Sequence, residues 1–481
     1  MSAAREPLQR VVVAGAGQVG VLAAIACKRA LPAAEVIVLG LPPDPGALAD
    51  RAATALPFTN KLHDRLGIAE EDIVAGAQGS HRLVTRYFGW GGVGQGGAMP
   101  YGAGTDPALR TRFAQEWGGG PRNAAGERPA GSLAEVLADA GRFAVPPEGA
   151  STPLAEVDYA LRWNPASYYA LLVERAQKLG VAHMQGELSA IEPDGAGGIA
   201  ALSVAGAGRL PADLFLDCTG PSARLLTALP DFAIEDWSVE LPMRRLILAR
   251  PQQAMLALED RFSLLAEGWL SELAGRDGLQ VMLGVAEGVT EDAALRALAA
   301  PPLAGFQLEP SRARAPWLGN VVALGDAAAR FEPLAHLNLD LAHRQLDLLL
   351  DLLPGRAIEP LERAEYNRRS ALMMDGVRDT LAAHYAAPAA QAVFGLPILS
   401  PQLAVALDQF ARRGRMPFRE EAPLLTPEFQ ALLAALGYPH GASPQARATG
   451  AVESEAASRR FREQAKAALA FAPPYAQFMG R

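Results

Sequence analysis

The stretch VVVAGAGQVG, residues 11–20, runs a buried-strand pattern directly into a Gly-x-Gly-x-x-Gly turn. An apolar, alanine-rich segment follows and predicts a helix, and EVIVL at residues 35–39 predicts a second strand. In such a unit Gly15 permits the tight turn, Gly17 lets backbone approach a pyrophosphate, and Gly20 lets helix pack on strand. The alternative is a glycine-rich loop that binds nothing. The second strand, at the spacing of a βαβ unit, argues against it.

The composition indicates a large globular protein. The chain has 481 residues, 50% of them hydrophobic, which is enough for two or three lobes. Its net charge is −8 with no block of like charge, so we expect neither nucleic acid nor a membrane surface as a partner. The apolar run through the glycine turn is interpreted as strand plus helix rather than as a membrane span.

The cysteine and histidine content argues against disulfides and metal. Cys27 and Cys218 both stand among apolar residues, and we expect each to be a buried, reduced thiol. The seven histidines are scattered without ligand spacing, so no metal site is predicted. The polar start of the chain has no secretory pattern, and a cytoplasmic protein is the expectation.

The middle of the chain alternates between strand-like and glycine-rich segments. Residues 81–88 predict one strand, and the glycine cluster at 89–97 is interpreted as a plain loop, because no helical pattern opens behind it. Residues 102–152 are rich in glycine, proline and alanine and are interpreted as an insertion with one helix at 132–140. Beyond residue 360 the pattern is helical.

Two later segments indicate which dinucleotide is bound. Residues 212–220, ADLFLDCTG, form a buried-strand pattern closing on Asp-x-Thr-Gly, which recurs in flavoproteins. Residues 319–326, GNVVALGD, form another buried strand that ends at an acid. These segments favour FAD over NAD. Asp326 is then expected to bind a ribitol or ribose hydroxyl, and its alternative role is an ordinary helix N-cap.

The predicted fold class is α/β, with a glutathione-reductase-like FAD-binding domain, an inserted mixed-sheet substrate lobe and a helical C-terminal region. The predicted boundaries are 1–101, 153–220 and 317–356 for the FAD-binding domain, 102–152 for the insertion, 221–316 for the substrate lobe and 357–481 for the helical region.

Several separated segments of the chain together support a resemblance to a known family. They are the glycine turn, residues 53–68, the strand ending in Trp90, and residues 212–220, 235–242, 268–269, 316–320, 331–334, 365–368 and 410–421. In this order, they resemble the flavin-dependent tryptophan halogenases over most of the chain. The resemblance implies reduced FAD from a separate flavin reductase, oxidation of halide to hypohalous acid, and its transfer to a lysine beside an aromatic substrate, free or within a peptide. It also implies a possible homodimer.

The resemblance assigns cofactor contacts to particular positions. They are Gly15, Ala16, Gly17, Gln18, Val19, Gly20, Thr219, Gly220, Gly325, Asp326, Leu337 and Asn338. No second Gly-x-Gly-x-x-Gly domain for a nicotinamide is recognised, which agrees with an external supply of reduced flavin.

The catalytic positions depart from the family pattern. The family's lysine, eight residues before the strand-ending tryptophan, is Arg82 here, and its glutamate is Ala335. His336 and Leu337 replace the small hydroxyl residues that follow near the halide. An arginine keeps its charge but is a poor nucleophile.

Two departures lie outside the catalytic positions. The family's tryptophan-rich stretch is reduced to Trp269 alone. Gly40 stands where the second strand should end in an acid for the adenosine ribose, and Asp44 or Asp50 is the candidate replacement. The affinity for FAD is therefore in question.

These departures leave three hypotheses. The first is an FAD-dependent monooxygenase or oxidase acting on an aromatic substrate, with Arg82 binding the substrate and His336 serving as base or hydrogen-bond donor. The second is a non-catalytic or FAD-deficient binding protein. The third is a true halogenase with an atypical site. The alternatives for the two residues are a strand-surface charge at Arg82 and a capping histidine at His336, whereas His63 and His343 are expected to be structural.

Overall fold

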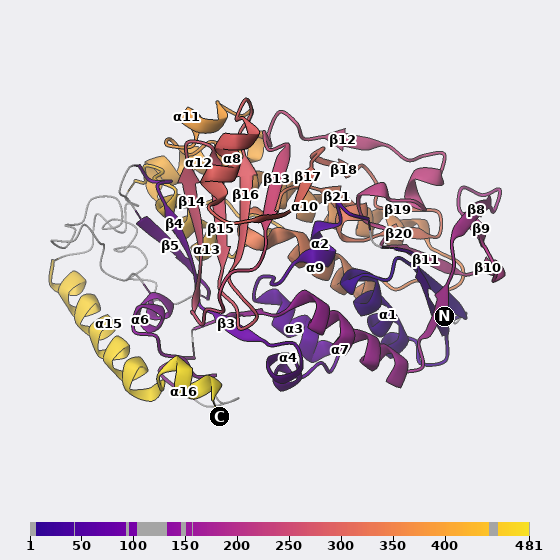
Figure 1. Cartoon of the computed structure of the whole chain (residues 1–481), viewed down its shortest axis with the longest axis horizontal. Coiled ribbons are helices and arrows are strands. Elements are labelled where there is room, and N and C mark those ends of the chain that lie inside the picture. The colour runs from indigo at the N-terminus through magenta and orange to yellow at the C-terminus, as the bar shows by residue number, and fades with distance from the viewer. Residues whose placement is uncertain are drawn as a thin grey trace. The chain divides into compact units, whose positions relative to one another are not determined.

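The computed structural model describes residues 6–42, 44–92, 96–102, 132–145, 151–155, 157–441 and 451–480. These residues form two compact units, each assembled from three separate stretches of chain (Figure 1). The first unit comprises residues 1–79, 163–238 and 306–378, and the second comprises residues 80–162, 239–305 and 379–481. The domain boundaries expected from the sequence remain a prediction.

The first unit is built on the predicted nucleotide-binding sheet. Its six strands lie in the order β19-β20-β11-β1-β2-β7, all parallel except the β19–β20 pair. Their bounds are Trp317–Leu318 for β19, Val321–Ala323 for β20, Leu214–Asp217 for β11, Arg10–Ala14 for β1, Glu35–Gly40 for β2 and Ala182–Gln185 for β7. Val11, Val12 and Val13 are fully buried. Buried parallel strands need helices on the sheet faces, and the intervening sequence supplies them.

Helix α1 (Gln18–Ala30) is the central helix of this unit. It packs against α7 (Pro165–Lys178) and α9 (Leu337–Asp351) (Figure 1). It is apolar nearly all round and is buried from its first turn to Cys27, as expected for a helix enclosed on several sides. The unit also contains α2 (Leu48–Arg51), α3 (Phe58–Arg65), α4 (Glu70–Gly76) and the first part of α10 (Pro360–Tyr385).

Two small antiparallel sheets complete the first unit. One has the order β10-β9-β8 and the other the order β12-β18-β21. In the first sheet, β10 is Gly208–Pro211, β9 is Ile199–Val204 and β8 is Leu188–Pro193. In the second sheet, β12 is Ile234–Asp236, β18 is Ser311–Ala313 and β21 is Ala329–Arg330.

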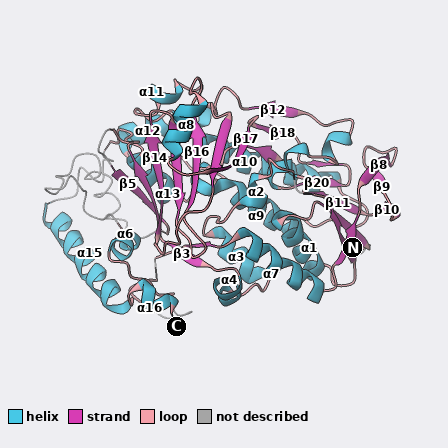
Figure 2. Ribbon diagram, in the orientation of Figure 1, coloured by secondary structure: helices cyan, strands magenta, loops and turns pink. Residues whose placement is uncertain are grey.

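The second unit is built on a mixed, seven-stranded sheet, whose strands are magenta in Figure 2. The strand order is β17-β13-β16-β15-β14-β4-β5. The β14–β4 pair is parallel, and the pairs β13–β16, β16–β15, β15–β14 and β4–β5 are antiparallel. The bounds are Pro302–Gln307 for β17, Arg245–Ala249 for β13, Gln280–Val285 for β16, Gly268–Leu273 for β15, Glu259–Leu265 for β14, Val84–Phe88 for β4 and Gly96–Pro100 for β5.

The helices of the second unit follow the predicted pattern. They are α6 (Leu133–Asp139), α8 (Glu291–Leu298), α11 (Gln391–Phe394), α12 (Pro401–Arg413), α13 (Thr426–Ala435), α15 (Ala451–Phe471) and α16 (Tyr475–Met479). Side-chain N-caps begin three of them, at Ser132, Thr290 and Ser400. Such caps satisfy backbone donors that a helix start leaves free. No described helix is long and apolar enough to cross a membrane.

Two expectations for this region are wrong. Residues 81–88 do not form one strand: β3 (Ser80–Arg82) pairs with β6 (Ala160–Arg162), whereas β4 joins the large sheet. The break is at Leu83, whose backbone N–H donates to the Leu258 carbonyl at 2.7 Å. The glycine cluster is not loop throughout, because its last glycines open β5; residues 93–95 lie outside the described residues. Most of the expected insertion also lies outside them.

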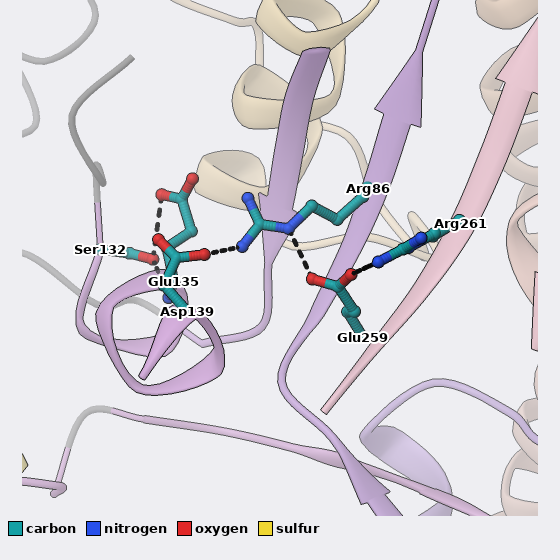
Figure 3. Close-up of polar contacts among 6 residues, drawn as sticks. All are labelled: Arg86, Ser132, Glu135, Asp139, Glu259 and Arg261. Atoms are coloured by element: carbon teal, nitrogen blue, oxygen red, sulfur yellow. Dashed lines mark hydrogen bonds and ion pairs between the residues drawn. The ribbon is translucent and has the colours of Figure 1, made fainter. Parts of the chain in front are cut away.

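A polar network attaches α6 to the large sheet (Figure 3). Arg86 on β4 donates to Glu259 on β14 at 2.8 Å and is ion-paired with Asp139 at the end of α6. Arg261 pairs with the same Glu259 at 2.7 Å. At the other end of α6, the Ser132 hydroxyl accepts a hydrogen bond from the Glu135 N–H at 3.2 Å.

Ser132→Ala should destabilise α6 by about 1 kcal/mol, the usual cost of removing a side-chain N-cap. The cap holds only the first turn, so the large sheet should be unaffected. Hydrogen exchange of the α6 amides should rise about fivefold or more, whereas exchange in β14 should not change. A uniform rise in both elements would contradict this local role.

Candidate active site

The glycine turn has the close contacts that its sequence predicted. Gly15 has φ +105°, and a Cβ atom on it would lie 2.2 Å from the Cys218 carbonyl oxygen. A Cβ atom on Gly20 would lie 2.0 Å from the Gly15 carbonyl oxygen. Both neighbours are backbone atoms that a side chain could not displace. The turn therefore brings the start of α1 directly against β1 and β11.

The structure brings the three predicted flavin segments together. Ala14 is the register partner of Asp217, and Asp217 is that of Ala323 on the next strand. Because these strands are parallel, the segments that leave their carboxyl ends lie side by side: the glycine turn, Thr219 with Gly220, and Gly325 with Asp326. The carboxyl edge of such a sheet is where open α/β proteins bind nucleotides.

Asp217 holds the second of these segments in shape. It is fully buried, and its carboxylate accepts hydrogen bonds from the N–H and hydroxyl of Thr219 and from the N–H groups of Leu225 and Leu226, all at 2.7–3.1 Å. Burial raises the pKa of Asp217, although these hydrogen bonds act in the opposite direction. Its contacts are with its own turn, so Asp217 is a structural carboxylate.

Helix α2 contacts all three segments that the sequence predicted to lie at the flavin. Helix α2 is fastened to the glycine turn by the Gln18 side chain, which donates to the Ala49 carbonyl at 2.6 Å and to the Ala52 carbonyl at 3.0 Å. The Ala49 N–H donates to the Asp326 carboxylate at 2.7 Å. Gln18 and Asp326, both predicted to contact the cofactor, therefore have partners within the chain.

Asp50 on α2 lies at the glycine turn itself. Its carboxylate accepts a hydrogen bond at 3.0 Å from the N–H of Val19, in the first turn of α1. A Cβ atom on Gly17 would lie 2.1 Å from that carboxylate. Burial raises the pKa of Asp50 to about 6, against the lowering effects of Val19 and Arg51. Residue spacing could not reveal this contact, because it depends on how the loop after β2 folds back.

The end of β2 is covered by a different side chain from those expected. Neither Asp44 nor Asp50 takes the place of an acid at Gly40: Asp44 accepts from the Gly46 N–H, and Asp50 lies at the glycine turn. A Cβ atom on Gly40 would lie 2.5 Å from the amide of Gln185 on β7. Sequence reasoning missed Gln185, because only the β2–β7 pairing brings it there.

The entry to α9 has an unusual backbone. Ala335 and His336 both have φ +59°, a left-handed conformation that is uncommon outside glycine. His336 is partly exposed and precedes the first helical residue, Leu337, which is buried. Asn338 donates to the Phe331 carbonyl at 2.9 Å and also hydrogen-bonds to Asp326, and burial raises the Asp326 pKa to about 7.

Arg82 is enclosed in the second unit. Its side chain is 2% exposed and pairs with Asp260 on β14, which is 1% exposed, at 2.5 Å. Thr85 donates to the same carboxylate at 3.2 Å, and the guanidinium lies 5.3 Å from the Tyr101 ring centroid. Burial acts to lower the pKa of Arg82, but Asp260 and Tyr101 outweigh it and raise that pKa. Arg82 and His336 belong to different units.

The remaining tryptophan of the reduced stretch lies in an aromatic core. Trp269 is fully buried, and its indole N–H donates to the Tyr385 hydroxyl at 3.2 Å. The indole N–H of Trp90 likewise donates to the Phe262 carbonyl at 3.1 Å. Trp90 and Trp269, two of the tryptophans in the segments that supported the family resemblance, are therefore packed within the second unit.

His63, His343 and the two cysteines are buried. His63 bonds to the Tyr168 hydroxyl at 2.7 Å, and His343 bonds to the Thr59 hydroxyl at 2.8 Å. Burial lowers the pKa of His63 to about 3, so this ring stays neutral. Cys27 and Cys218 are both free and buried, and burial raises the pKa of each. Among the described residues there is no cluster of potential metal ligands.

Comparison with known proteins agrees with this architecture. The tryptophan halogenase family profile matches residues 10–451. The chain belongs to the tryptophan halogenase family. Tryptophan 7-halogenase RebH from Lentzea aerocolonigenes is 23% identical over 428 residues, which are 79% of this chain and 76% of RebH. Tryptophan 7-halogenase KtzQ from Kutzneria sp. (strain 744) is 26% identical over 414 residues, with the same coverage.

The fold is shared with solved flavin-dependent halogenases. Xcc4156 from Xanthomonas campestris superposes with a TM-score of 0.87 at 23% identity, covering 99% of this chain and 98% of that protein. The predicted α/β fold class is thereby confirmed. The family uses FAD in its reduced form, supplied by a separate flavin reductase, as the sequence predicted.

The residues at the strand ends fit such a cofactor in part. Gly15 and Gly20 preserve the tight turn, and Gly17 keeps the start of α1 free of a side chain of its own. These features suit a pyrophosphate at a helix N-terminus. Asp50, however, directs a carboxylate at the donor that a pyrophosphate would use.

Proposed function

We propose that this tryptophan halogenase family member is an FAD-dependent oxidoreductase, a monooxygenase or oxidase, that acts on an electron-rich aromatic substrate without the lysine relay of its relatives. The observation that carries the proposal is the state of Arg82. At the family's lysine position stands a guanidinium that is 2% exposed and ion-paired with Asp260. A charged guanidinium held in this way does not act as a nucleophile toward an oxidised halogen species.

The residues at the start of α9 support the same proposal. The family's glutamate position is Ala335, which carries no proton-transfer group. His336 follows it and is partly exposed. Reduced FAD, when bound, would supply electrons to oxygen. We assign His336 the role of hydrogen-bond donor or base for the substrate in that reaction.

The relatives support an aromatic substrate. RebH and KtzQ are both named as halogenases of tryptophan. We propose that this chain also takes an aromatic ring, either free or within a peptide. Hydroxylation and halogenation both require an electron-rich ring. Loss of the lysine relay would therefore change the reaction, but the substrate would still need such a ring.

The test supplies the protein with FAD, a flavin reductase, a nicotinamide reductant, oxygen and bromide, together with indole, tryptophan and a panel of tryptophan-containing peptides. Products are identified by mass. We expect an oxygenated or dehydrogenated aromatic product whose yield does not depend on bromide. His336→Ala should lower its rate by about 10²-fold or more, the usual contribution of a general acid or base, while FAD binding stays unchanged.

Two other outcomes would replace this proposal. A brominated product would identify a halogenase with an atypical site. A protein that forms no product and takes up no FAD under any condition would instead be a binding protein, a function favoured by the carboxylate at the glycine turn.

A further inference from the structure

The start of α1 already has an anionic partner within the chain. Asp50 Oδ1 lies 3.0 Å from the Val19 nitrogen, and the carboxylate covers the bare Cα face of Gly17. An α-helix leaves its first N–H groups free and carries partial positive charge there, which favours an anion. In the family's cofactor that anion is the pyrophosphate.

We propose that the Asp50 carboxylate competes with the FAD pyrophosphate for the N-terminus of α1, so that Asp50 sets the flavin affinity of this protein. The proposal rests on the flavin dependence within the proposed function. It assigns to Asp50 an effect on cofactor binding that is separate from the chemistry at Arg82 and His336.

Hydrogen bonds to the backbone of α2 hold Asp50 at the start of α1. Gln18 holds the backbone of α2 on the glycine turn through the Ala49 and Ala52 carbonyls, and Asp326 holds the Ala49 N–H. With its backbone fixed at both places, Asp50 must be displaced by rotation of its side chain. The residue as a whole keeps some exposure, although its carboxyl group is buried enough to raise its pKa, so rotation of the side chain can carry the carboxylate toward water without opening α2.

The surrounding charges act against a bound pyrophosphate. Asp44, in the loop before α2, and Asp50 both raise the pKa of Asp326, in the turn after β20, in the same direction as burial. The cations that face this cluster are Arg51 on α2 and Arg330 on β21. The Cys218 thiol, also adjacent, stays protonated because burial raises its pKa. A doubly negative pyrophosphate would therefore enter beside several carboxylates.

The sign of the pH dependence follows from these groups. Burial holds the pKa of Asp50 at about 6 and that of Asp326 at about 7, both above the ordinary range of a carboxyl group. Below these values each group is neutral, and above them each is an anion. The pyrophosphate of FAD keeps its charge throughout this range. FAD should therefore bind more tightly at pH 5.5 than at pH 8.

The experiment measures FAD binding to the full chain by quenching of flavin fluorescence, at pH 5.5 and pH 8, with no substrate present. Asp50→Asn keeps an oxygen that can accept from the Val19 N–H but removes the charge. It should bind FAD about tenfold more tightly than the wild type at pH 8, a change of about 1.4 kcal/mol. At pH 5.5 the two proteins should differ little, since Asp50 is then largely neutral.

The matched control is Asp213→Asn. Asp213 accepts from the backbone N–H groups of Gln9 and Arg10 at 2.7 and 3.0 Å, at the opposite edge of the same sheet. Like Asp50, Asp213 is a carboxylate that accepts hydrogen bonds from the backbone. Asp213→Asn removes its charge and leaves the glycine turn unchanged. Its FAD affinity should equal that of the wild type at both pH values.

The outcomes distinguish a failure of the role of Asp50 from a failure of the flavin-dependent function. Equal affinity of wild type and Asp50→Asn at pH 8, or a wild-type affinity that does not rise toward pH 5.5, overturns the role of Asp50 and leaves the flavin-dependent function standing. No FAD binding by either protein at either pH overturns both. If Asp50→Asn fails to fold, as judged by circular dichroism, a wild-type affinity that does not rise toward pH 5.5 still overturns the role of Asp50.

Discussion

Asp260→Ala should lower the free energy of unfolding by about 3–5 kcal/mol, the usual cost of leaving a buried charge without its partner. Arg82 on β3 and Asp260 on β14 are 2% and 1% exposed, and they form a buried ion pair. Without Asp260, the guanidinium would remain charged, because an arginine does not deprotonate in proteins. Urea unfolding followed by tryptophan fluorescence, with buried Trp90 and Trp269 in the same unit, measures the loss.

Two variants make this prediction specific. Asp408→Ala removes one partner of the exposed Arg412–Asp408 pair on α12, whose side chains are 75% and 55% exposed, and should cost less than about 1 kcal/mol. Arg82→Met combined with Asp260→Leu removes both charges and should recover much of the stability lost in the single variant. A small effect of Asp260→Ala would mean that Arg82 is open to solvent and available to substrate.

Gly20→Ala should both destabilise the first unit and weaken FAD binding. Its Cβ would lie 2.0 Å from the Gly15 carbonyl oxygen, so α1 must move away from the turn. Overpacking of this kind costs about 1–3 kcal/mol. The movement would also misplace the N–H groups at the start of α1, and we expect FAD affinity to fall about tenfold or more.

The control for this glycine is Gly305→Ala on β17. There an added Cβ would meet only the Leu246 carbonyl oxygen, at an ordinary distance of 3.8 Å. We expect no loss of FAD binding and little change in the thermal midpoint. Thermal unfolding and flavin fluorescence on the two variants check both expectations. Normal FAD binding by Gly20→Ala would show that close approach of α1 is not needed.

Much of the first unit could be predicted because its signals are local. The alternating glycines at the turn and the apolar strands each act within a few residues, so the pattern alone predicts a helix after the turn and nearly the whole of β2. The order of three flavin-type segments along the chain predicted that they would meet. The parallel pairing of β1, β11 and β20 bears this out.

Other features depended on contacts that sequence patterns do not contain. Residues 81–88 have the pattern of one strand, and the break at Leu83 comes from a hydrogen bond to Leu258, far away in the chain. Gln185 covers Gly40 only because β7 pairs with β2. A strand pattern specifies which residues are buried, but it does not specify which neighbour buries them.

The sequence by itself determined that the chain has a dinucleotide turn and that its order of segments is that of a flavin-dependent halogenase. The assignment of Arg82 and Ala335 to the family's catalytic positions stays a prediction. Only the tertiary structure decided what surrounds those positions. It pairs Arg82 with Asp260, 178 residues away, and directs Asp50 at the N–H of Val19, 31 residues away. The physical reason is that residue types and spacing determine local backbone geometry, whereas charge pairing depends on the path of the whole chain.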